Sequence, residues 1–203
     1  MQIENHKEEV PFAHYEQLFR ETDPERIARR LPETRWDGEH FYLQLMHKTY
    51  VVSHKEATVC GEAEENPLPM TTRTFLLRYL LESREVPSGG RWKTFREMPW
   101  GEMYMKPYSG RVLSRAAFTF GTQLDAFRAA CKKMGATPVN HGNAGYEFRF
   151  IGNYKMQIPV WEGDEEFPPN AQILYSDNFA EGFTAEDRVV AADILIAAIK
   201  ENM

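Results

Sequence analysis

The alternation of apolar and polar side chains between residues 146 and 158 limits most strongly how this chain can fold. On both sides of Gly152-Asn153, every second residue is aromatic or aliphatic. A period of two places these side chains on one face of an extended strand. The stretch therefore predicts an antiparallel hairpin whose apolar face carries Tyr146, Phe148, Phe150, Tyr154, Met156 and Ile158.

The length of the turn fixes the register of this hairpin. A two-residue turn would set Phe150 opposite Lys155 and split the apolar set between two faces. A loop at 151–153 instead pairs Phe150 with Tyr154, so we expect that loop, with near left-handed geometry at Asn153. The same register gives the pairs Phe148–Met156 and Tyr146–Ile158.

A second alternation, at residues 41–54, predicts another hairpin. With a loop at 46–49, its apolar residues share one side. The expected pairs are Leu45 with Tyr50, Leu43 with Val52 and Phe41 with His54. In the later hairpin, Pro159 indicates that the second strand reaches a sheet edge or ends there, because proline has no N–H to donate.

Apolar residues at helical spacing, together with cap residues, predict the helices. They are expected at 12–20, from Asp23-Pro24 to before Pro32, after a cap at Thr71 or Thr72, at 112–120, from a capping box at 122–125 to Gly135, and from Ala185 after Thr184. Loops are expected at 61–70 and 163–169, and irregular aromatic-rich structure at 89–110. Two hairpins and about six helices, grouped rather than alternating, predict an α+β single domain of antiparallel hairpins packed with helices.

Composition excludes some classes of function. A net charge of −6 over 203 residues argues against sequence-independent nucleic-acid binding, which depends on Lys and Arg. The two isolated cysteines, Cys60 and Cys131, fit a reducing compartment. The polar start of the chain predicts no signal peptide, and no apolar run approaches the ~20 residues of a membrane span. We therefore expect a cytoplasmic protein.

The common catalytic signatures are missing from the sequence: GxGxxG, Walker, HExxH, CxxC and GxSxG. His40, His47 and His54 lie seven residues apart. The expected register puts His47 in the turn and the other two on opposite faces. No metal site is therefore expected there, since zinc needs three or four converging ligands.

Polar residues of two loops are the weak catalytic candidates. His141 lies among glycines and asparagines, where it could act as a general acid or base or as an axial ligand, or belong to a plain turn. Glu165 and Glu166 could act as catalytic carboxylates. With Asp164 and Asp177 they could also hold a hard cation, although an acidic loop is equally a solvated turn.

Aromatic residues supply the ligand-binding candidates. Trp92, Tyr104 and Trp161, together with Trp100, could wall a pocket for a flat or apolar ligand, and Arg96 could bind its carboxylate. Ordinary core packing explains the same residues. We count Trp92, Arg96, Tyr104, Trp161, Asp164 and Asp177 as the candidate ligand-binding set.

Three segments carry a resemblance to a known family. They are residues 90–99 (GRWKTFREMP), residues 158–168 (IPVW followed by GDEEFP), and residues 173–177 (ILYSD) ahead of Glu186-Asp187. On these segments the chain resembles an uncharacterised bacterial and archaeal family, domain of unknown function 3786. The similarity runs from about Phe41, which divides the chain into an N-terminal helical segment (1–38) and a family-like core (39–203).

What the resemblance implies is a context. Such domains look typical of anaerobes and are sometimes fused behind a cysteine-rich iron-sulfur module. Because the two cysteines here are far apart, electron transfer would need a redox or iron-sulfur partner protein. Our first hypothesis is an accessory protein that binds a small ligand or cofactor of unknown identity without catalysis. The alternatives are a carboxylate-dependent enzyme, with or without a divalent cation, and a protein-interaction module.

Overall fold

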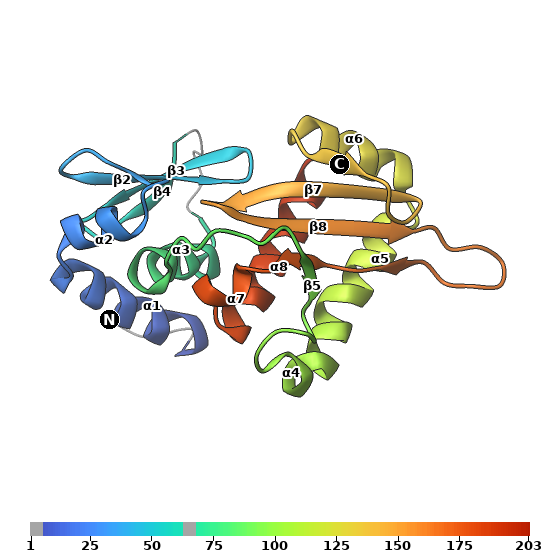
Figure 1. Cartoon of the computed structure of the whole chain (residues 1–203), viewed down its shortest axis with the longest axis horizontal. Coiled ribbons are helices and arrows are strands. Elements are labelled where there is room, and N and C mark those ends of the chain that lie inside the picture. Colours follow the sequence, from blue (N-terminus) through green and yellow to red (C-terminus); the bar gives the residue numbers. More distant parts are fainter. Residues whose placement is uncertain (1–5, 63–67) are drawn as a thin grey trace.

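A computed structural model describes residues 6–62 and 68–203 of the chain (Figure 1). The helices are α1 (His6–Glu21), α2 (Pro24–Arg30), α3 (Met70–Glu82), α4 (Gly101–Tyr108), the π-helix η1 (Ser109–Ser114), α5 (Arg115–Phe120), α6 (Leu124–Lys133), α7 (Phe179–Gly182) and α8 (Ala185–Glu201). The strands are β1 (Arg35–Trp36), β2 (His40–Leu45), β3 (Lys48–Ser53), β4 (Val59–Gly61), β5 (Trp92–Thr94), β6 (Thr137–Val139), β7 (Ala144–Ile151), β8 (Tyr154–Trp161), β9 (Asn170–Ala171) and β10 (Leu174–Ser176).

The strands form one sheet in the order β4-β3-β2-β7-β8-β10-β5, with β1, β6 and β9 pairing alongside. The strand pairs found in the described residues are antiparallel. In Figure 1, α1, α3 and α7 lie below β2, β3 and β4, and α8 passes behind β7 and β8. The predicted α+β class is confirmed. Among the described residues, no helix is both long enough and apolar enough to cross a membrane.

The hairpin of β7 and β8 has the predicted face but a different turn. Phe148 pairs with Met156, and Tyr146 with Ile158, as expected. The turn is nevertheless Gly152-Asn153, and the left-handed residue is Gly152 (φ 54°) rather than Asn153. Tyr154 pairs with Ile151 rather than with Phe150, so that predicted pair was wrong, and a register shift between Arg149 and Ile151 brings the rest of the apolar set into the predicted pairs. The β-bulge thus provides the extra residue that the prediction assigned to the loop.

Pro159 does not end β8, which continues to Trp161. It also does not mark an edge, because β8 is flanked by β7 on one side and by β9 and β10 on the other. Pro159 lies opposite Gly145, and its carbonyl oxygen accepts a hydrogen bond from the backbone N–H of Gln172 (3.0 Å). The expectation of an edge was therefore wrong.

The hairpin of β2 and β3 is tighter than predicted. Leu45 pairs with Lys48, and Phe41 with Val52 rather than His54, so the turn has only two residues. Met46 takes the left-handed conformation (φ 52°) that such a turn requires. Because the register moved by two residues, the apolar side chains still share the predicted face.

The predicted helices at the two ends of the chain are present. The side chain of Asp23 accepts a hydrogen bond from the N–H of Glu25 and caps α2. Thr184 and Asp187 form a complete capping box at the start of α8. Helix α1 covers 12–20 and begins earlier, at His6.

Other helix starts differ from the prediction. Helix α3 begins at Met70, so Thr71 and Thr72 lie in its first turn rather than capping it. The expected capping box at 122–125 is absent, because the hydroxyl of Thr122 donates instead to the carbonyl oxygen of Phe118. Gly135 does end that helical segment in left-handed geometry (φ 73°).

Two predicted irregular segments are shorter than expected. The aromatic-rich stretch 89–110 contains strand β5 and helix α4, and α4 continues without a break into η1 and α5. Of the predicted loop 61–70, Gly61 ends β4 and Met70 begins α3, while 63–67 lie outside the described residues. The acidic turn 163–169 connects β8 to β9 and projects from the body of the protein (Figure 1).

Candidate functional site

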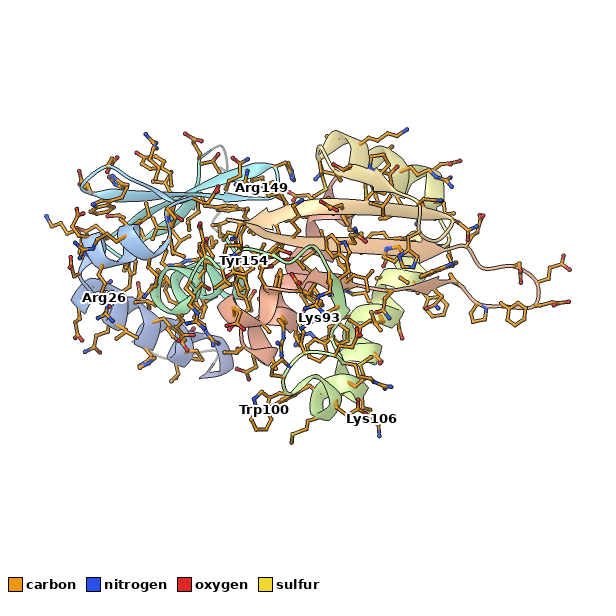
Figure 2. The ribbon with its side chains drawn as sticks, in the orientation of Figure 1. Arg26, Lys93, Trp100, Lys106, Arg149 and Tyr154 are labelled. Atoms are coloured by element: carbon orange, nitrogen blue, oxygen red, sulfur yellow. The ribbon has the colours of Figure 1, made fainter. Side chains whose placement is uncertain are left out.

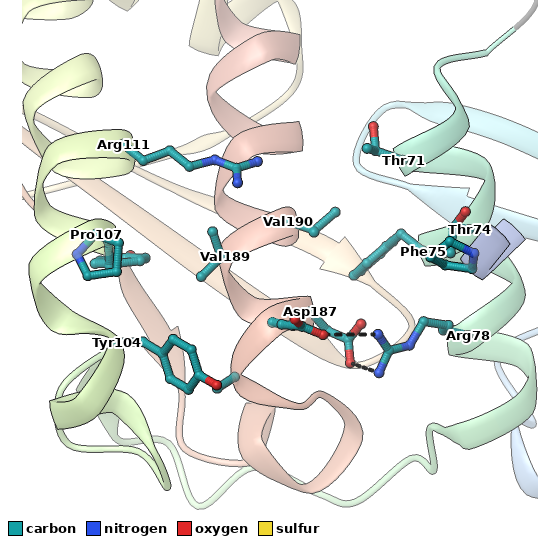
Figure 3. A pocket seen from close by; sticks show the side chains of 14 residues that line it. Thr71, Thr74, Phe75, Arg78, Tyr104, Pro107, Arg111, Asp187, Val189 and Val190 are labelled. Atoms are coloured by element: carbon teal, nitrogen blue, oxygen red, sulfur yellow. Dashed lines mark ion pairs between the residues drawn. The ribbon is translucent and has the colours of Figure 1, made fainter. Parts of the chain in front are cut away.

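The largest hollow that we describe is a groove between α3, α4 and α8, with a volume of about 540 Å³ (Figure 3). This lies within the range of about 300–1,000 Å³ typical of small-molecule sites. The apolar residues that line it are Pro11, Phe75, Tyr104, Pro107, Tyr108, Ala185, Val189 and Val190, and the polar ones are Thr71, Thr74, Arg78, Arg111, Glu186 and Asp187.

The composition of α8 explains why its groove face is apolar. The helix is apolar on several sides, and its inner residues Ala191, Ala192, Leu195 and Ile199 are buried. Val189 and Val190 therefore remain half-buried and form the groove wall. An apolar wall that the protein leaves open can bind apolar ligand surface.

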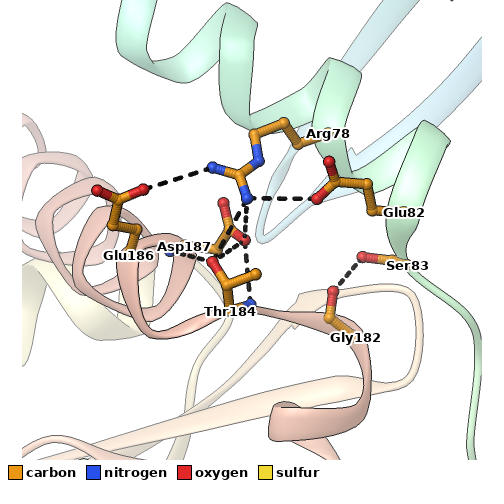
Figure 4. Close-up of polar contacts among 7 residues, drawn as sticks. All are labelled: Arg78, Glu82, Ser83, Gly182, Thr184, Glu186 and Asp187. Carbon is orange, nitrogen blue, oxygen red and sulfur yellow. Dashed lines mark hydrogen bonds and ion pairs between the residues drawn. The ribbon is translucent and has the colours of Figure 1, made fainter. Parts of the chain in front are cut away.

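One end of the groove is polar and has an excess of carboxylates (Figure 4). The guanidinium of Arg78 lies 3.1 Å from Asp187 Oδ2, 3.3 Å from Glu82 and 3.9 Å from Glu186. Burial raises the pKa of Asp187, against the hydrogen bonds from Thr184 and the charge of Arg78. One cation thus faces three carboxylates, so this end does not attract anions.

The other end has an excess of positive charge. Arg111 and Arg115 both form ion pairs with the carboxylate of Asp193, the latter at 2.9 Å. Two guanidinium groups share a single carboxylate, and Arg111 lines the groove (Figure 3). Arg111 belongs to the π-helix η1, a geometry that recurs at functional sites. The groove therefore has an end that can bind an anionic group.

A buried pair of tyrosines holds the groove walls together. Tyr175 donates a hydrogen bond to the backbone carbonyl oxygen of Arg188 (2.9 Å), and the hydroxyls of Tyr108 and Tyr175 lie 3.0 Å apart. Because a tyrosine hydroxyl has one proton, Tyr108 must be the donor within the pair. Burial raises the pKa of both tyrosines. The contacts connect α4, β10 and α8 beneath the groove.

Of the residues predicted to bind a ligand, Tyr104 lies in this groove. Trp161 lines a second hollow of about 460 Å³ with Phe167, Pro168 and Pro169, next to the acidic turn. His141 is exposed and packs edge-on against the ring of Trp161, with centroids 5.4 Å apart. The structure thus brings His141 and Trp161 together, and neither of them lines the groove that contains Tyr104.

The acidic residues of the turn are exposed. Asp164 accepts hydrogen bonds from the N–H groups of Glu166 (2.9 Å) and Phe167 (2.7 Å), which closes the turn. Glu165 and Glu166 are solvent-exposed. Within residues 6–62 and 68–203, no group of three or more His, Cys, Asp or Glu side chains has an arrangement that could hold a metal ion. A catalytic role for His141, Glu165 and Glu166 stays a prediction.

The remaining candidates lie around β5. Trp92 pairs with Ser176, and Asp177 accepts hydrogen bonds from Ser88 Oγ (2.6 Å) and the N–H of Gly89 (2.9 Å), which holds this loop against β10. These contacts lower the pKa of Asp177. Arg96 is exposed and forms an ion pair with Glu102 (3.1 Å). The candidate set is therefore distributed over three places rather than one pocket.

Comparison with known protein families assigns a family to this chain. The family described as "Domain of unknown function (DUF3786)" matches residues 23–198. The chain belongs to this family. No curated protein and no solved structure shows a significant match. The match includes α2, which lies in the segment that the sequence analysis set apart from the core.

In this DUF3786 chain, the three segments that carry the resemblance come together. They contain β5, β8 and β10, and β10 pairs with both of the others. Sequence patterns did not point to Arg78, Arg111, Val189 and Val190 as site residues. Arg78 had a signal, since it is the one charged residue within the apolar run 75–81. The others had none, because their shared groove forms only when α4 packs near α8.

Proposed function

We propose that this protein binds a small amphipathic organic anion in the groove between α3, α4 and α8. The apolar or flat part of the ligand lies against Val189, Val190 and Tyr104, and its anionic group lies at Arg111. The observation that carries the proposal is an open apolar groove of about 540 Å³ with an arginine excess at one end. An accessory role beside a redox or iron-sulfur partner stays a prediction.

The charge distribution supports an anion in one orientation. At the Arg78 end, Asp187, Glu82 and Glu186 repel an anionic group. At the Arg111 end, Asp193 neutralises one of two guanidinium groups. A ligand with a single acidic group therefore binds with that group at Arg111 and its apolar part toward Phe75.

Titration with 8-anilinonaphthalene-1-sulfonate, an amphipathic anion that fluoresces in apolar surroundings, tests the proposal. We expect saturable binding that Val190→Trp abolishes by filling the groove. Arg111→Gln should weaken binding by up to about fivefold, since an exposed ion pair contributes about 0.2–1 kcal/mol. Arg128→Gln is the matched control: Arg128 pairs with Asp125 on α6, outside the groove, and should leave binding unchanged.

Circular dichroism of each variant shows whether it keeps the fold. If folded Val190→Trp binds the probe as tightly as the native chain does, the groove is not the binding site and the proposal is wrong. The same holds if Arg111→Gln and Arg128→Gln weaken binding equally, because the effect is then one of net charge.

A second candidate, a protein-interaction module, is supported by one feature of the acidic turn. Phe167 is 65% exposed at the tip of a projecting loop, beside the hollow that Trp161 lines. Aromatic side chains are enriched at protein–protein interfaces relative to the rest of the surface. If the acidic turn binds a partner protein, Phe167→Ser should lower the recovery of a specific partner in pull-downs. Phe118 is an exposed phenylalanine of α5, and the control variant Phe118→Ser should leave that recovery unchanged.

A further inference from the structure

Arg188, in the first turns of α8, is a buried cation that has no carboxylate partner among the described residues. The residue is only 1% exposed to solvent. Nη2 donates a hydrogen bond to the carbonyl oxygen of Pro99. Nε is buried and has no hydrogen-bond partner, and we find no ion pair to Arg188 in the part of the chain that the structure describes. Arginine is almost never fully buried unless it is paired.

Among the described residues, no neighbouring carboxylate forms an ion pair with this guanidinium. Asp187, the adjacent residue, directs its carboxylate to Arg78 (3.1 Å) and to Thr184 (2.6 Å). The ring of Phe95 lies under the guanidinium at 5.6 Å, close to the limit of about 6 Å for cation–π attraction, and it carries no net negative charge. A buried, unneutralised guanidinium is costly, because water is removed and no opposite charge replaces it.

A separate hollow of about 330 Å³ lies beside Arg188. It is bounded by Pro99 and Trp100 and by the segment from Ala180 to Ala185, of which Ala185 also lines the groove. Thr184 caps the N–H of Asp187, while the N–H of Ala185, in the first turn, has no acceptor within the helix. The positive end of the dipole of α8 therefore adds to the charge of Arg188.

Trp100 forms the outer rim of this hollow. It is 67% exposed, and its backbone is left-handed (φ 65°), which is uncommon for a large residue (Figure 2). Gly101 permits the conformation: a Cβ there would lie 1.9 Å from the carbonyl oxygen of Phe95. Strained backbone of this kind gathers at ligand sites.

Two carboxylates also line the hollow, but each has its own partner. Glu82 pairs with Arg78 at 3.3 Å, and Glu181 pairs with Arg84 at 2.8 Å. Neither forms an ion pair with Arg188. Among the described residues, no carboxylate is therefore left to pair with Arg188, and an anionic ligand would supply the missing charge.

We propose that this hollow is an oxyanion site, in which Arg188 and the start of α8 bind the carboxylate or phosphate group of a small metabolite and Trp100 covers it. The site is distinct from the groove of the proposed function, and neither depends on the other. An anionic group in the hollow would lie next to the Arg188 side chain and the start of α8, and it would supply the opposite charge that Arg188 lacks among the described residues.

Fluorine NMR of protein labelled with 5-fluorotryptophan tests the site directly. The chain has four tryptophans, whose resonances are assigned with single Trp→Phe variants. Inorganic phosphate and benzoate are titrated separately at constant ionic strength, up to about 50 mM, well above the Kd of a millimolar site. We expect the Trp100 resonance to shift and that of Trp36 to stay fixed. Which of the two anions is effective distinguishes phosphate from carboxylate.

Variants decide whether Arg188 is responsible. Arg188→Gln should remove the shift of Trp100 in a chain that circular dichroism shows to be folded. If that variant does not fold, Ala180→Glu supplies a carboxylate within the hollow and should weaken anion binding about tenfold or more. Ala197→Glu, an exposed position on α8, is its matched control and should bind normally.

Three results would overturn the proposal. The first is that neither anion moves the Trp100 resonance over the full titration. The second is that Trp161 responds instead, which places the anion at the other hollow. The third is that folded Arg188→Gln, or Ala180→Glu in its place, responds as the native chain does, because Arg188 then has a purely structural role at Pro99.

Discussion

Replacing Tyr175 by phenylalanine tests how the groove walls are held together. Its hydroxyl donates to the carbonyl oxygen of Arg188 and accepts from Tyr108. Tyr175→Phe removes both bonds and leaves the buried Tyr108 hydroxyl without an acceptor. Leaving a buried donor unsatisfied costs about 1–3 kcal/mol, so we expect the free energy of unfolding to fall by that amount.

The partner substitution should cost less. In Tyr108→Phe, the hydroxyl of Tyr175 keeps its bond to Arg188, and the protein loses one net hydrogen bond, about 0.5–1.5 kcal/mol. In the double variant no donor is left unsatisfied. Its cost should therefore fall below the sum of the single costs by more than the ~0.5 kcal/mol scatter of independent sites.

Urea unfolding followed by circular dichroism measures these differences. Tyr104→Phe is the control, since Tyr104 is 46% exposed and we find no hydrogen bond from its hydroxyl among the described residues. It should change stability by less than about 0.5 kcal/mol. If Tyr175→Phe costs no more than Tyr108→Phe, or if the two costs add, the assigned direction of the hydrogen bonds is wrong.

Three further predictions concern single residues. Asp37 accepts hydrogen bonds from the N–H groups of His40 and Glu39, which lower its pKa to about 2. The contribution of Asp37 to stability is therefore complete above the ordinary pKa of about 4 and is lost as the pH falls through 2. A carboxyl NMR titration that gives Asp37 an ordinary pKa would contradict this. The Trp100→Gly variant should be about 1 kcal/mol more stable than Trp100→Ala in thermal unfolding, because glycine adopts the left-handed backbone conformation of this position without the cost that alanine has. Equal stability of the two variants would show that the backbone at position 100 is not strained. Cys60 is exposed, while Cys131 is buried and burial raises the pKa of its thiol. An aromatic disulfide reagent should therefore modify one thiol in the native protein and two in urea. Rapid modification of both thiols in the native protein would contradict the burial of Cys131.

The sequence by itself determined the local structure. Alternation from 146 to 158 defined the hairpin face, and Thr184 with Asp187 defined the start of α8, because these signals depend on neighbours in the chain. Where the prediction was wrong, a local alternative of similar energy existed. Left-handed Met46 and the bulge after Arg149 are such cases.

The sites were decided by tertiary structure. Val190 and Arg111 are 79 positions apart in numbering and share a groove only because α4 and η1 pack near α8. The same holds for Arg188, which has no carboxylate partner among the described residues although the sequence places Asp187 beside it. Sequence patterns report periodicity within an element, whereas a groove or an unpaired buried charge depends on which elements meet, and that follows from the packing of the whole core.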